Sequence, residues 1–312
     1  MRKVLVIGAG GFVGHYLTKQ LTSDGCEVHG TYIKGGPYPD QDIVSHELDI
    51  LDQTAIEKLL IEIEPDWIIH LAAQSSVALS WKNPGLTIDI NIKGTSNLLE
   101  AIKTKSPHVR LLLIGSAEEY GKTSHELIKE TESLQPQNIY AITKVTQEML
   151  GKLYVQAYGL DIVMARPFNH IGPGQSTQFV VPDFCEQVAR IDKGLSEPVI
   201  KVGNLKAKRD FTDVRDVVRA YSLLLQKGEK GEVYNIGSSK PVTIQWILDT
   251  ILSLSKKQIS VEIDPQKYRE IDIPVVSADI TKIITRTGWK PQREILTTIE
   301  ESFASVWVEP IR

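Results

Sequence analysis

The sequence predicts an α/β fold, in which a doubly wound parallel sheet carries helices on both faces and is joined to a smaller C-terminal α/β lobe. Short apolar runs alternate with amphipathic stretches through the first half of the 312-residue chain. The first run leads directly into a glycine-rich turn at residues 8–14. Apolar runs of this kind are typical of strands buried on both faces, and their alternation with helices implies right-handed crossovers.

The elements of the first part follow this rhythm. Strands are predicted, in chain order, at 3–7, 27–32, 43–48, 67–71, 110–114 and 161–166. Helices are predicted at 12–21, at 54–64, after Pro84 as a long helix that carries Asn91, and from 139 onward. Asn138 is a suitable N-cap for the last of these helices, and Gly159 is a suitable residue to end it.

A proline- and glycine-rich segment at 167–174 breaks the rhythm and marks the start of the lobe. The chain returns to the sheet near 233–236, and the lobe then gains a helix at 244–254, a strand at 259–263 and a terminal helix from about 295. We therefore expect residues 1–165, with a return segment at about 211–236, to form one domain. Residues 166–210 and 237–312 are expected to form the other.

Composition limits the classes of protein and site to be considered. Hydrophobic residues make up 42% of the chain, so a sizeable core can be buried. The net charge of -4 argues against a nucleic-acid-binding protein, whose surface is normally basic. Cys26 and Cys185 lack the spacing of a metal site and fit a reducing, cytoplasmic location. No apolar run reaches the roughly 18 residues of a membrane span, and the first run is interpreted as a strand, not a signal peptide.

The glycine turn predicts a dinucleotide site. Gly8, Gly11 and Gly14 allow a sharp turn, close approach of a ligand and tight packing of the next helix, whose N-terminal N–H groups suit a pyrophosphate. After the second strand, where an NAD-selective site carries an acidic residue, the chain has Gly30-Thr31-Tyr32-Ile33-Lys34. NADP is therefore favoured and NAD stays open, because Lys34 either attracts a 2′-phosphate or is simply a solvated residue.

Tyr140 and Lys144 lie four residues apart and so share one face of a helix. An adjacent ammonium favours the phenolate and lowers the pKa of a tyrosine, which would make this pair a tunable acid and base. Ser116 follows the fifth strand, at the edge of the sheet where ligands bind. The helix also carries an apolar stripe, expected to form core or dimer contacts: Ile139, Ile142, Val145, Met149, Leu153 and Ala157.

Taken together, several motifs resemble those of a known family: Gly8-x-x-Gly11-x-x-Gly14, Leu71-Ala72-Ala73, Asn91, Ser116 ahead of Tyr120-Gly121, and Tyr140-x-x-x-Lys144. The whole chain resembles the extended short-chain dehydrogenase/reductases, which have a Rossmann fold and act on nucleotide sugars. Within that group, the stretches 168–176, 179–180 and 202–216 look most like GDP-6-deoxy-D-mannose reductases.

The resemblance implies an NAD(P)H-dependent reductase that converts GDP-4-keto-6-deoxy-D-mannose to GDP-D-rhamnose. Tyr140 would protonate the ketone oxygen as hydride arrives at C4, and Ser116 would donate a hydrogen bond to the same oxygen. Lys144 would hold the nicotinamide ribose and depress the Tyr140 pKa. The family usually forms homodimers, in which the helix after Pro84 and the Tyr140 helix build a four-helix bundle.

The resemblance also implies two sets of binding residues. Those expected to bind the cofactor, NADP(H) or NAD(H), are Gly8, Gly11, Phe12, Val13, Gly14, Thr31, Lys34, Asp49, Ile50, Leu71, Ala72, Ala73, Asn91, Tyr140, Lys144, Pro167 and Phe168. Those expected to bind the nucleotide sugar, preferably a GDP-sugar, are Ser75, Ser76, Ser116, Glu118, Asn169, Val180, Asn204, Arg209, Arg269 and Asp272. The two arginines suit diphosphate oxygens because a guanidinium group is fork-shaped.

Three other functions stay open. A 4,6-dehydratase is the nearest, because Glu118 stands where related dehydratases keep a catalytic Glu that removes the C5 proton, so we count Glu118 among the catalytic candidates. A nucleotide-sugar 4-epimerase comes next. A non-enzymatic dinucleotide sensor would be expected to lack part of the Ser116, Tyr140 and Lys144 set, which is complete here. Ala117 replaces a small hydroxyl residue of related enzymes, and Ile33-Lys34 stands where they usually have an Arg.

Overall fold

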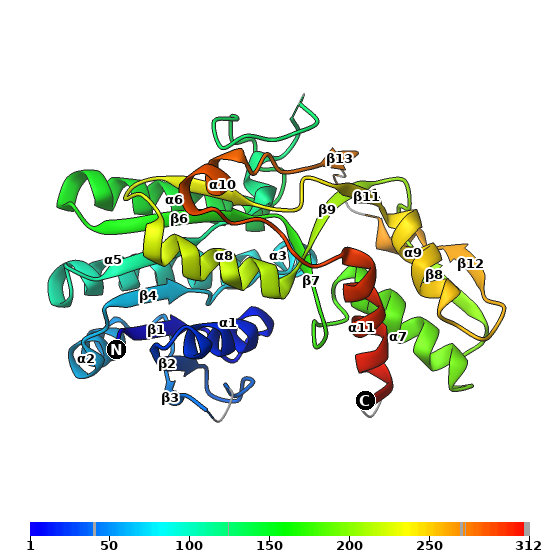
Figure 1. Ribbon diagram of the computed structural model, residues 1–312, viewed down its shortest axis with the longest axis horizontal. Coiled ribbons are helices and arrows are strands. Elements are labelled where there is room, and N and C mark those ends of the chain that lie inside the picture. Colours follow the sequence, from blue (N-terminus) through cyan, green and yellow to red (C-terminus); the bar gives the residue numbers. More distant parts are fainter. Residues whose placement is uncertain (40–41, 124, 269–270, 272, 309–312) are drawn as a thin grey trace.

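A seven-stranded, all-parallel sheet forms the larger part of the protein in the computed structural model, which describes residues 1–39, 42–123, 125–268, 271 and 273–308 (Figure 1). Its strands, in chain order, are β1 (Lys3–Ile7), β2 (Glu27–Tyr32), β3 (Val44–Glu47), β4 (Trp67–His70), β5 (Arg110–Ile114), β6 (Asp161–Pro167) and β10 (Val233–Ile236). The order across the sheet is β10-β6-β5-β4-β1-β2-β3. The chain therefore switches direction between β1 and β4, and ligands of such sheets bind beyond the strand ends at that point.

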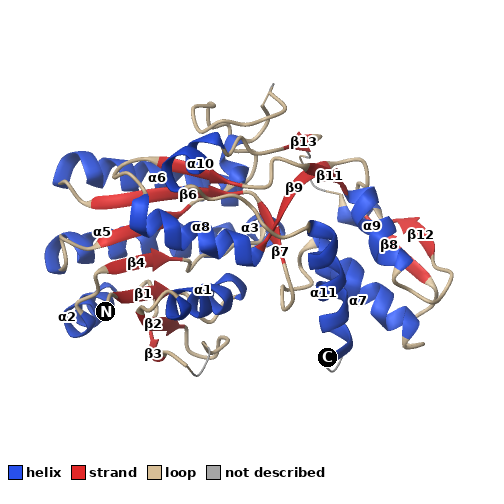
Figure 2. Ribbon diagram, viewed as in Figure 1, coloured by secondary structure: helices blue, strands red, loops and turns tan. Residues whose placement is uncertain are grey.

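Helices cover both faces of this sheet (Figures 1 and 2). On β1, Val4 and Val6 belong to one buried cluster while Leu5 and Ile7 belong to another, because successive side chains of a strand point to opposite faces. The first cluster packs under α1 (Phe12–Ser23) and α8 (Val214–Lys227). Helices α2 (Gln53–Ile63), α5 (Gly94–Lys105) and α6 (Ile139–Tyr158) cover the second. This confirms the predicted doubly wound α/β fold.

The segment between β4 and α5 is helical but interrupted. It consists of α3 (Val77–Lys82), α4 (Pro84–Ile88) and a π-helical turn, Asp89–Lys93, that runs directly into α5. The sequence predicted one long helix here and no α3. A single π-helical turn within a helix is often found at functional sites, and this one carries Asn91.

The smaller part of the protein has its own core. It contains α7 (Val180–Asp192), α9 (Ile244–Ser253) and α11 (Ile295–Val308), whose apolar side chains pack with Phe211 of β9. Its strands are β7 (Asn169–Ile171), β8 (Val199–Val202), β9 (Lys208–Asp213), β11 (Pro241–Thr243), β12 (Ser260–Ile263) and β13 (Val275–Val276). β9 pairs with β7, β11 and β13, whereas β8 pairs with β12. A short 3-10 helix, η3 (Pro265–Lys267), follows β12.

The chain near its C-terminal end returns to the first core, which the sequence did not indicate. Helix α10 (Thr281–Thr287) was expected in the lobe with the rest of 237–312, yet Ile283 and Trp289 are fully buried in the cluster beneath α8. The Trp289 indole N–H donates to the carbonyl oxygen of Asp216 at 2.9 Å. Apolar spacing marks a buried helix face but does not say which core it joins. The division into two domains stays a prediction.

The apolar stripe of α6 lies on the surface. Ile142, Met149 and Leu153 are 50%, 63% and 54% exposed, so the core interpretation of these residues is wrong. The core face of α6 instead carries Tyr140, Lys144 and Tyr154. Periodicity alone could not distinguish the two faces, because both are rich in large side chains.

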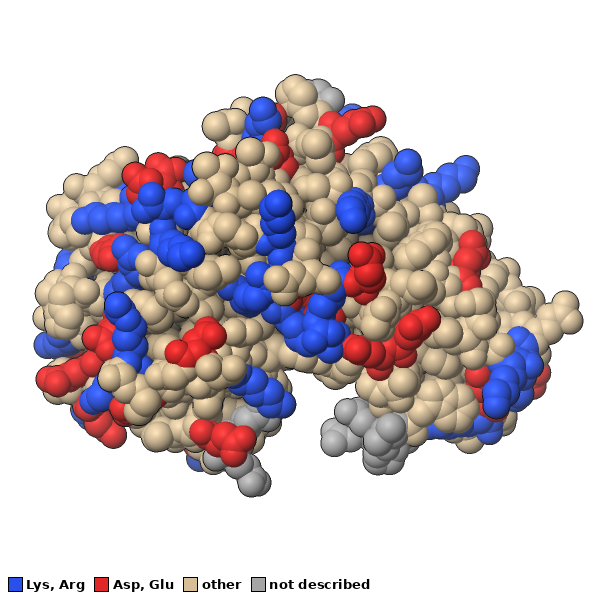
Figure 3. All heavy atoms as spheres, viewed as in Figure 1, with Lys and Arg blue, Asp and Glu red and all other residues tan. Residues whose placement is uncertain are grey.

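The surface shows no segregation of charge on the face drawn in Figure 3, where Lys and Arg side chains are interspersed with Asp and Glu. Figure 3 also shows the surface hollowed between the two parts. Among the described residues, no helix combines the length and apolarity needed to cross a bilayer.

Candidate functional site

The glycine turn lies between the carboxyl ends of β1, β2 and β4. Gly8 has φ +91°, and a Cβ atom there would lie 2.8 Å from the backbone nitrogen of Ala72. The N–H of Gly8 donates to the Thr31 hydroxyl oxygen at 3.0 Å, and the N–H of Ala9 donates to the Thr31 carbonyl oxygen at 2.8 Å. Thr31 is therefore a support of the turn, which only glycine can form at this distance from β4.

The turn presents the amino end of α1 without a capping side chain. Gly11 occupies the N-cap position and is exposed, and the first turn of α1 carries no acidic residue. Gly14 packs the helix onto the turn, because a Cβ atom there would lie 2.2 Å from the Ala9 carbonyl oxygen. The N–H groups of Phe12 and Val13 lie in an uncapped first turn, a place that favours phosphate oxygens.

The loop after β2 closes over the turn and supplies an aromatic pair that the sequence analysis missed. A Cβ atom on Gly10 would lie 2.0 Å from the Pro37 carbonyl oxygen, so this glycine is required for the loop to pack. The rings of Tyr32 and Tyr38 are tilted by 33° with their centroids 4.1 Å apart, and their hydroxyl oxygens lie 2.6 Å from each other. Lys34 lies between them in the sequence and is exposed. The predicted cofactor residue Lys34 thus belongs to the mostly exposed segment that joins the two tyrosines.

The ends of β3 and β4 place the next predicted cofactor residues. The N–H groups of Leu71 and Ala72 both donate to the Ile7 carbonyl oxygen at 2.9 Å, which brings the start of 71–73 against the glycine turn. Asp49 is exposed and accepts from the N–H of Leu51 at 2.9 Å. Ile50 is buried and packs on Gly94, where a Cβ atom would lie 2.7 Å from it.

Asn91 connects the loop after β4 to α6. Its side-chain amide donates to the Thr143 hydroxyl at 2.9 Å and to the Gln74 carbonyl at 3.1 Å, and its Oδ1 accepts from the N–H of Gln74 at 2.8 Å. The residue is fully buried. Because these protein groups engage its amide, the structure shows Asn91 positioning α6, and its predicted contact with the cofactor stays a prediction.

Ser116, Tyr140 and Lys144 converge at the end of β5. Asn138 caps α6 by accepting from the N–H of Ala141 at 2.8 Å, so the predicted cap is confirmed. Tyr140, the second residue of the helix, is hydrogen-bonded to the Ser116 side chain. Lys144 donates from Nζ to the Ile114 carbonyl oxygen at 2.8 Å, and its Nζ lies 5.9 Å from the centre of the Tyr140 ring.

Burial, and not the neighbouring ammonium, dominates the electrostatics of this group. It raises the pKa of Tyr140 well above its usual range, and the hydrogen bond from Ser116 only partly offsets the rise. Burial therefore outweighs any lowering of this pKa by Lys144, and the net shift is opposite to the predicted one. Burial also lowers the pKa of Lys144 to about 8. A phenol with a raised pKa stays protonated at neutral pH, as a proton donor must.

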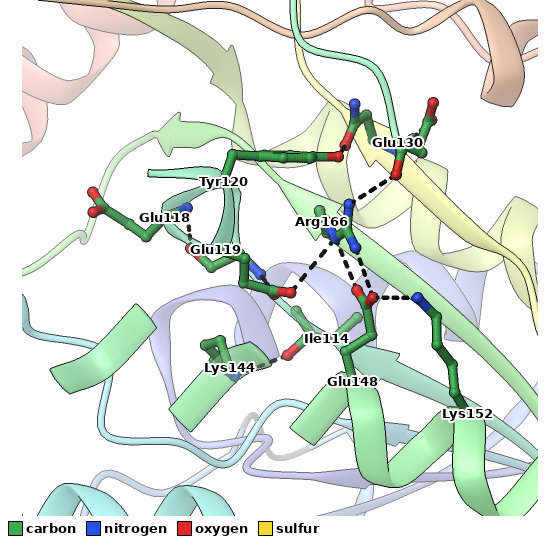
Figure 4. Close-up of polar contacts among 11 residues, drawn as sticks. Ile114, Glu118, Glu119, Tyr120, Glu130, Lys144, Glu148, Lys152 and Arg166 are labelled. Atoms are coloured by element: carbon green, nitrogen blue, oxygen red, sulfur yellow. Dashed lines mark hydrogen bonds and ion pairs between the residues drawn. The ribbon is translucent and has the colours of Figure 1, made fainter. Parts of the chain in front are cut away.

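Two consecutive glutamates follow Ser116 in the 3-10 helix η2 (Ala117–Tyr120) and have different surroundings. Glu118 is partly exposed and accepts from the Asn138 side-chain amide at 3.0 Å, next to Tyr140. Glu119, which the sequence analysis did not single out, is fully buried beside Arg166 of β6 (Figure 4). Its only sequence signal was a second carboxylate directly after the candidate Glu118.

Two of the predicted substrate residues belong to the smaller part of the protein and are held by its backbone. Arg209 of β9 is 7% exposed and donates to the Ile273 carbonyl oxygen at 2.6 Å. Asn204 accepts from the N–H of Lys206 at 3.0 Å. Arg269 and Asp272 lie outside the described residues.

The remaining predicted contacts lie near the strand ends. Ser76 caps α3 by accepting from the N–H of Leu79 at 3.2 Å. The others are Ser75, exposed just before it, Asn169 at the start of β7, Val180 at the start of α7, and Pro167 and Phe168, which are buried at the end of β6. His170 stacks on Phe12 with ring centroids 6.3 Å apart, which gives it a packing role.

Together these features fit a dinucleotide cofactor. The turn at Gly8 leaves backbone where a side chain would otherwise stand, and the uncapped end of α1 suits a diphosphate. Lys144 lies on the same edge of the sheet and has donor capacity beyond its bond to Ile114. The site therefore combines a cradle for a dinucleotide with a buried proton donor.

Comparison with known proteins agrees with this geometry. The model of the GDP-mannose 4,6 dehydratase family matches residues 5–302. GDP-6-deoxy-D-mannose reductase of Pseudomonas aeruginosa is 32% identical over 100% of this chain and 99% of that protein. GDP-mannose 4,6 dehydratase 2 of Arabidopsis thaliana is also 32% identical, over 93% of this chain and 83% of that protein. The solved structure of RMD from Pseudomonas aeruginosa complexed with NADPH superposes with a TM-score of 0.87 at 31% identity, covering 99% of each chain.

Substitutions at Gly11 and Gly14 separate the two uses of the glycine turn. In Gly11→Ala, the added Cβ atom would lie 3.5 Å from its nearest neighbour, so we expect near-normal stability. NADPH binding should be about tenfold weaker, because the methyl group would stand where the cofactor diphosphate is expected to approach. Gly14→Ala, forced against the Ala9 carbonyl, should lose about 2 kcal/mol or more of stability. Thermal unfolding and NADPH fluorescence titration measure both effects, and normal NADPH affinity in Gly11→Ala would contradict the assignment.

Proposed function

The chain belongs to the GDP-mannose 4,6 dehydratase family of NAD(P)-dependent, GDP-sugar-converting enzymes, and on that premise we propose that it is a reductase that converts GDP-4-keto-6-deoxy-D-mannose to GDP-D-rhamnose with NADPH. The full-length match to a GDP-6-deoxy-D-mannose reductase supports the proposal. So does the buried pair of hydroxyls on Ser116 and Tyr140, which is the observation that carries the chemistry.

The pair is arranged to receive a carbonyl oxygen. The Ser116 oxygen already accepts from the N–H of Glu118 at 3.2 Å, and its proton, which is donated to Tyr140 in this structure, would turn to the substrate oxygen. Tyr140, kept protonated by burial, transfers its proton to the same oxygen as that oxygen gains negative charge. Both donors are fixed before reaction, so little reorganisation is needed as the charge develops.

The cofactor supplies a hydride when it is bound. The glycine turn and the first turn of α1 would hold its diphosphate, and Lys144 would bind the nicotinamide ribose through its remaining donors. Lys34 would attract a 2′-phosphate, and Asp49 and Ile50 would contact the adenine. These assignments extend the expected role of residues 1–165, and the smaller lobe would bind the nucleotide sugar.

A 4,6-dehydratase is the second candidate because of one observation. The carboxylate of Glu118 lies next to Tyr140 and, by its charge, contributes to the raised pKa of that phenol. A base in this place could remove a proton from a sugar carbon adjacent to the reacting one. Its hydrogen bond from Asn138 ties it instead to the capping residue of α6, which supports the reductase.

Two properties complete the proposal. We infer a cytoplasmic location, which suits the free cysteines Cys26 and Cys185. We also infer a homodimer, because α3 and α4 pack against α6 and together leave an apolar surface, on which Trp81, Ile88 and Met149 are 47%, 45% and 63% exposed.

The reductase proposal predicts consumption of NADPH. Purified protein mixed with NADPH and GDP-4-keto-6-deoxy-D-mannose should lose absorbance at the reduced nicotinamide band, and GDP-mannose in place of the keto sugar should give none. Turnover of GDP-mannose without net consumption of cofactor would overturn the reductase in favour of the dehydratase.

The dimer proposal predicts a mass of two 34.8 kDa chains by light scattering. Met149→Asp and Leu153→Asp should shift the mass to that of one chain, because a buried, unpaired carboxylate opposes association. Ile61→Asp on α2 is the matched control, since Ile61 is as exposed but lies on another helix, and it should stay dimeric. A wild-type protein with the mass of one chain would contradict the proposal.

A further inference from the structure

Two buried side chains form hydrogen bonds with the backbone around Gly115, immediately before Ser116. Lys144 donates from Nζ to the carbonyl oxygen of Ile114 at 2.8 Å, and Glu119 Oε1 accepts from the N–H of Ser116 at 2.6 Å. These are the peptide groups on either side of Gly115. A Cβ atom on Gly115 would lie 2.3 Å from Glu119 Oε1, so the glycine is what lets the carboxyl group reach the backbone.

Glu119 is itself anchored in a buried cluster of ionisable side chains (Figure 4). Its Oε2 lies 3.5 Å from Nε of Arg166. Arg166 donates to both oxygens of Glu148 at 2.8 and 2.6 Å, and Lys152 donates to Glu148 at 2.7 Å. Arg166 is therefore paired mainly with Glu148. When Glu119 is ionised, its charge can act on a second neighbouring side chain.

That neighbour is Lys144. Burial lowers the pKa of Lys144, and the charge of Glu119 opposes that change. Burial raises the pKa of Glu119 to about 8, with Glu148 adding to the rise and Arg166 and Lys144 opposing it. From β4, His70 also faces Lys144, but burial lowers the pKa of its imidazole to about 3, so it stays neutral.

We propose that Glu119 is a positioning residue of the reductase: it fixes Ser116 through the backbone and, when ionised, keeps Lys144 in its charged form. This proposal rests on the reductase function proposed above. Because Glu119 is fully buried, it acts on substrate and cofactor through other residues: Ser116, Lys144 and, by its charge, Tyr140, whose pKa it helps to raise.

The proposal fixes the sign of a pH effect. Below neutral pH, Glu119 is protonated and Lys144 is charged in any case, so a neutral glutamine at 119 should behave as the wild type does. As pH rises, the wild-type carboxyl ionises and supports the ammonium, whereas glutamine cannot. Lys144 of Glu119→Gln should therefore lose its proton, and its hold on the cofactor, at lower pH.

The test follows NADPH affinity from pH 6 to 9.5 by fluorescence titration in the wild type, Glu119→Gln and Glu148→Gln. At pH 6.5, Glu119→Gln should bind NADPH with an affinity within about twofold of that of the wild type. As the pH rises, its affinity should fall at a pH about one unit lower than in the wild type. Glu148→Gln disrupts the same cluster, but it removes the negative charge that opposes ionisation of Glu119. The pH at which this variant loses NADPH affinity should therefore not be lower than in the wild type. The proposal would be overturned if NADPH affinity fell over the same alkaline pH range in Glu119→Gln and the wild type. It would also be overturned if Glu119→Gln lost affinity by the same factor at every pH.

Amide hydrogen exchange tests the backbone contact without cofactor. The amide of Ser116 should exchange about tenfold faster in Glu119→Ala than in the wild type. In Glu148→Gln its exchange rate should equal that of the wild type. Equal exchange in Glu119→Ala and the wild type would overturn the positioning role. If the wild type bound no NADPH, the reductase function would be overturned instead. The amide exchange of Ser116 would still show whether Glu119 holds the backbone at that residue.

Discussion

The burial of Tyr140 and Lys144 against the end of β5 is the constraint on which the rest of the structure depends. A phenol and an ammonium withdrawn from water need fixed partners, and the protein supplies them from Ser116 and the Ile114 carbonyl oxygen. These partners stand in place only if α6 keeps its position over the sheet. The cap at Asn138 fixes where α6 begins and so fixes the direction of both side chains.

Several separate segments hold this arrangement, each by contacts that are costly to lose. Asn91 bonds α6 to the loop after β4, and Glu119 bonds η2 to the backbone of Ser116. The glycine turn meets the same edge of the sheet because β1 lies next to β4. The dinucleotide cradle and the proton donor are thus brought together by strand order, and their side chains only refine the distance.

The sequence predicted those parts whose signals are local. β1, β2 and β5 have the predicted bounds, because continuous apolar runs mark strands buried on both faces, and α6 begins and ends at its predicted caps. Features that depend on distant partners were not predictable. The place of α10, the exposure of Met149 and the burial of Glu119 follow from which surfaces meet, and the pKa of Tyr140 follows from the same packing.

The central claim is that Tyr140 delivers a proton to a sugar ketone that receives hydride from NADPH. Its most direct test uses NADPH deuterated at the transferable position of nicotinamide C4 and follows the label by mass spectrometry and NMR. The account predicts deuterium at C4 of the deoxy sugar with the wild type, and loss of this transfer in Tyr140→Phe while NADPH still binds. Label absent from the sugar with the wild type, or full transfer in Tyr140→Phe, would contradict it.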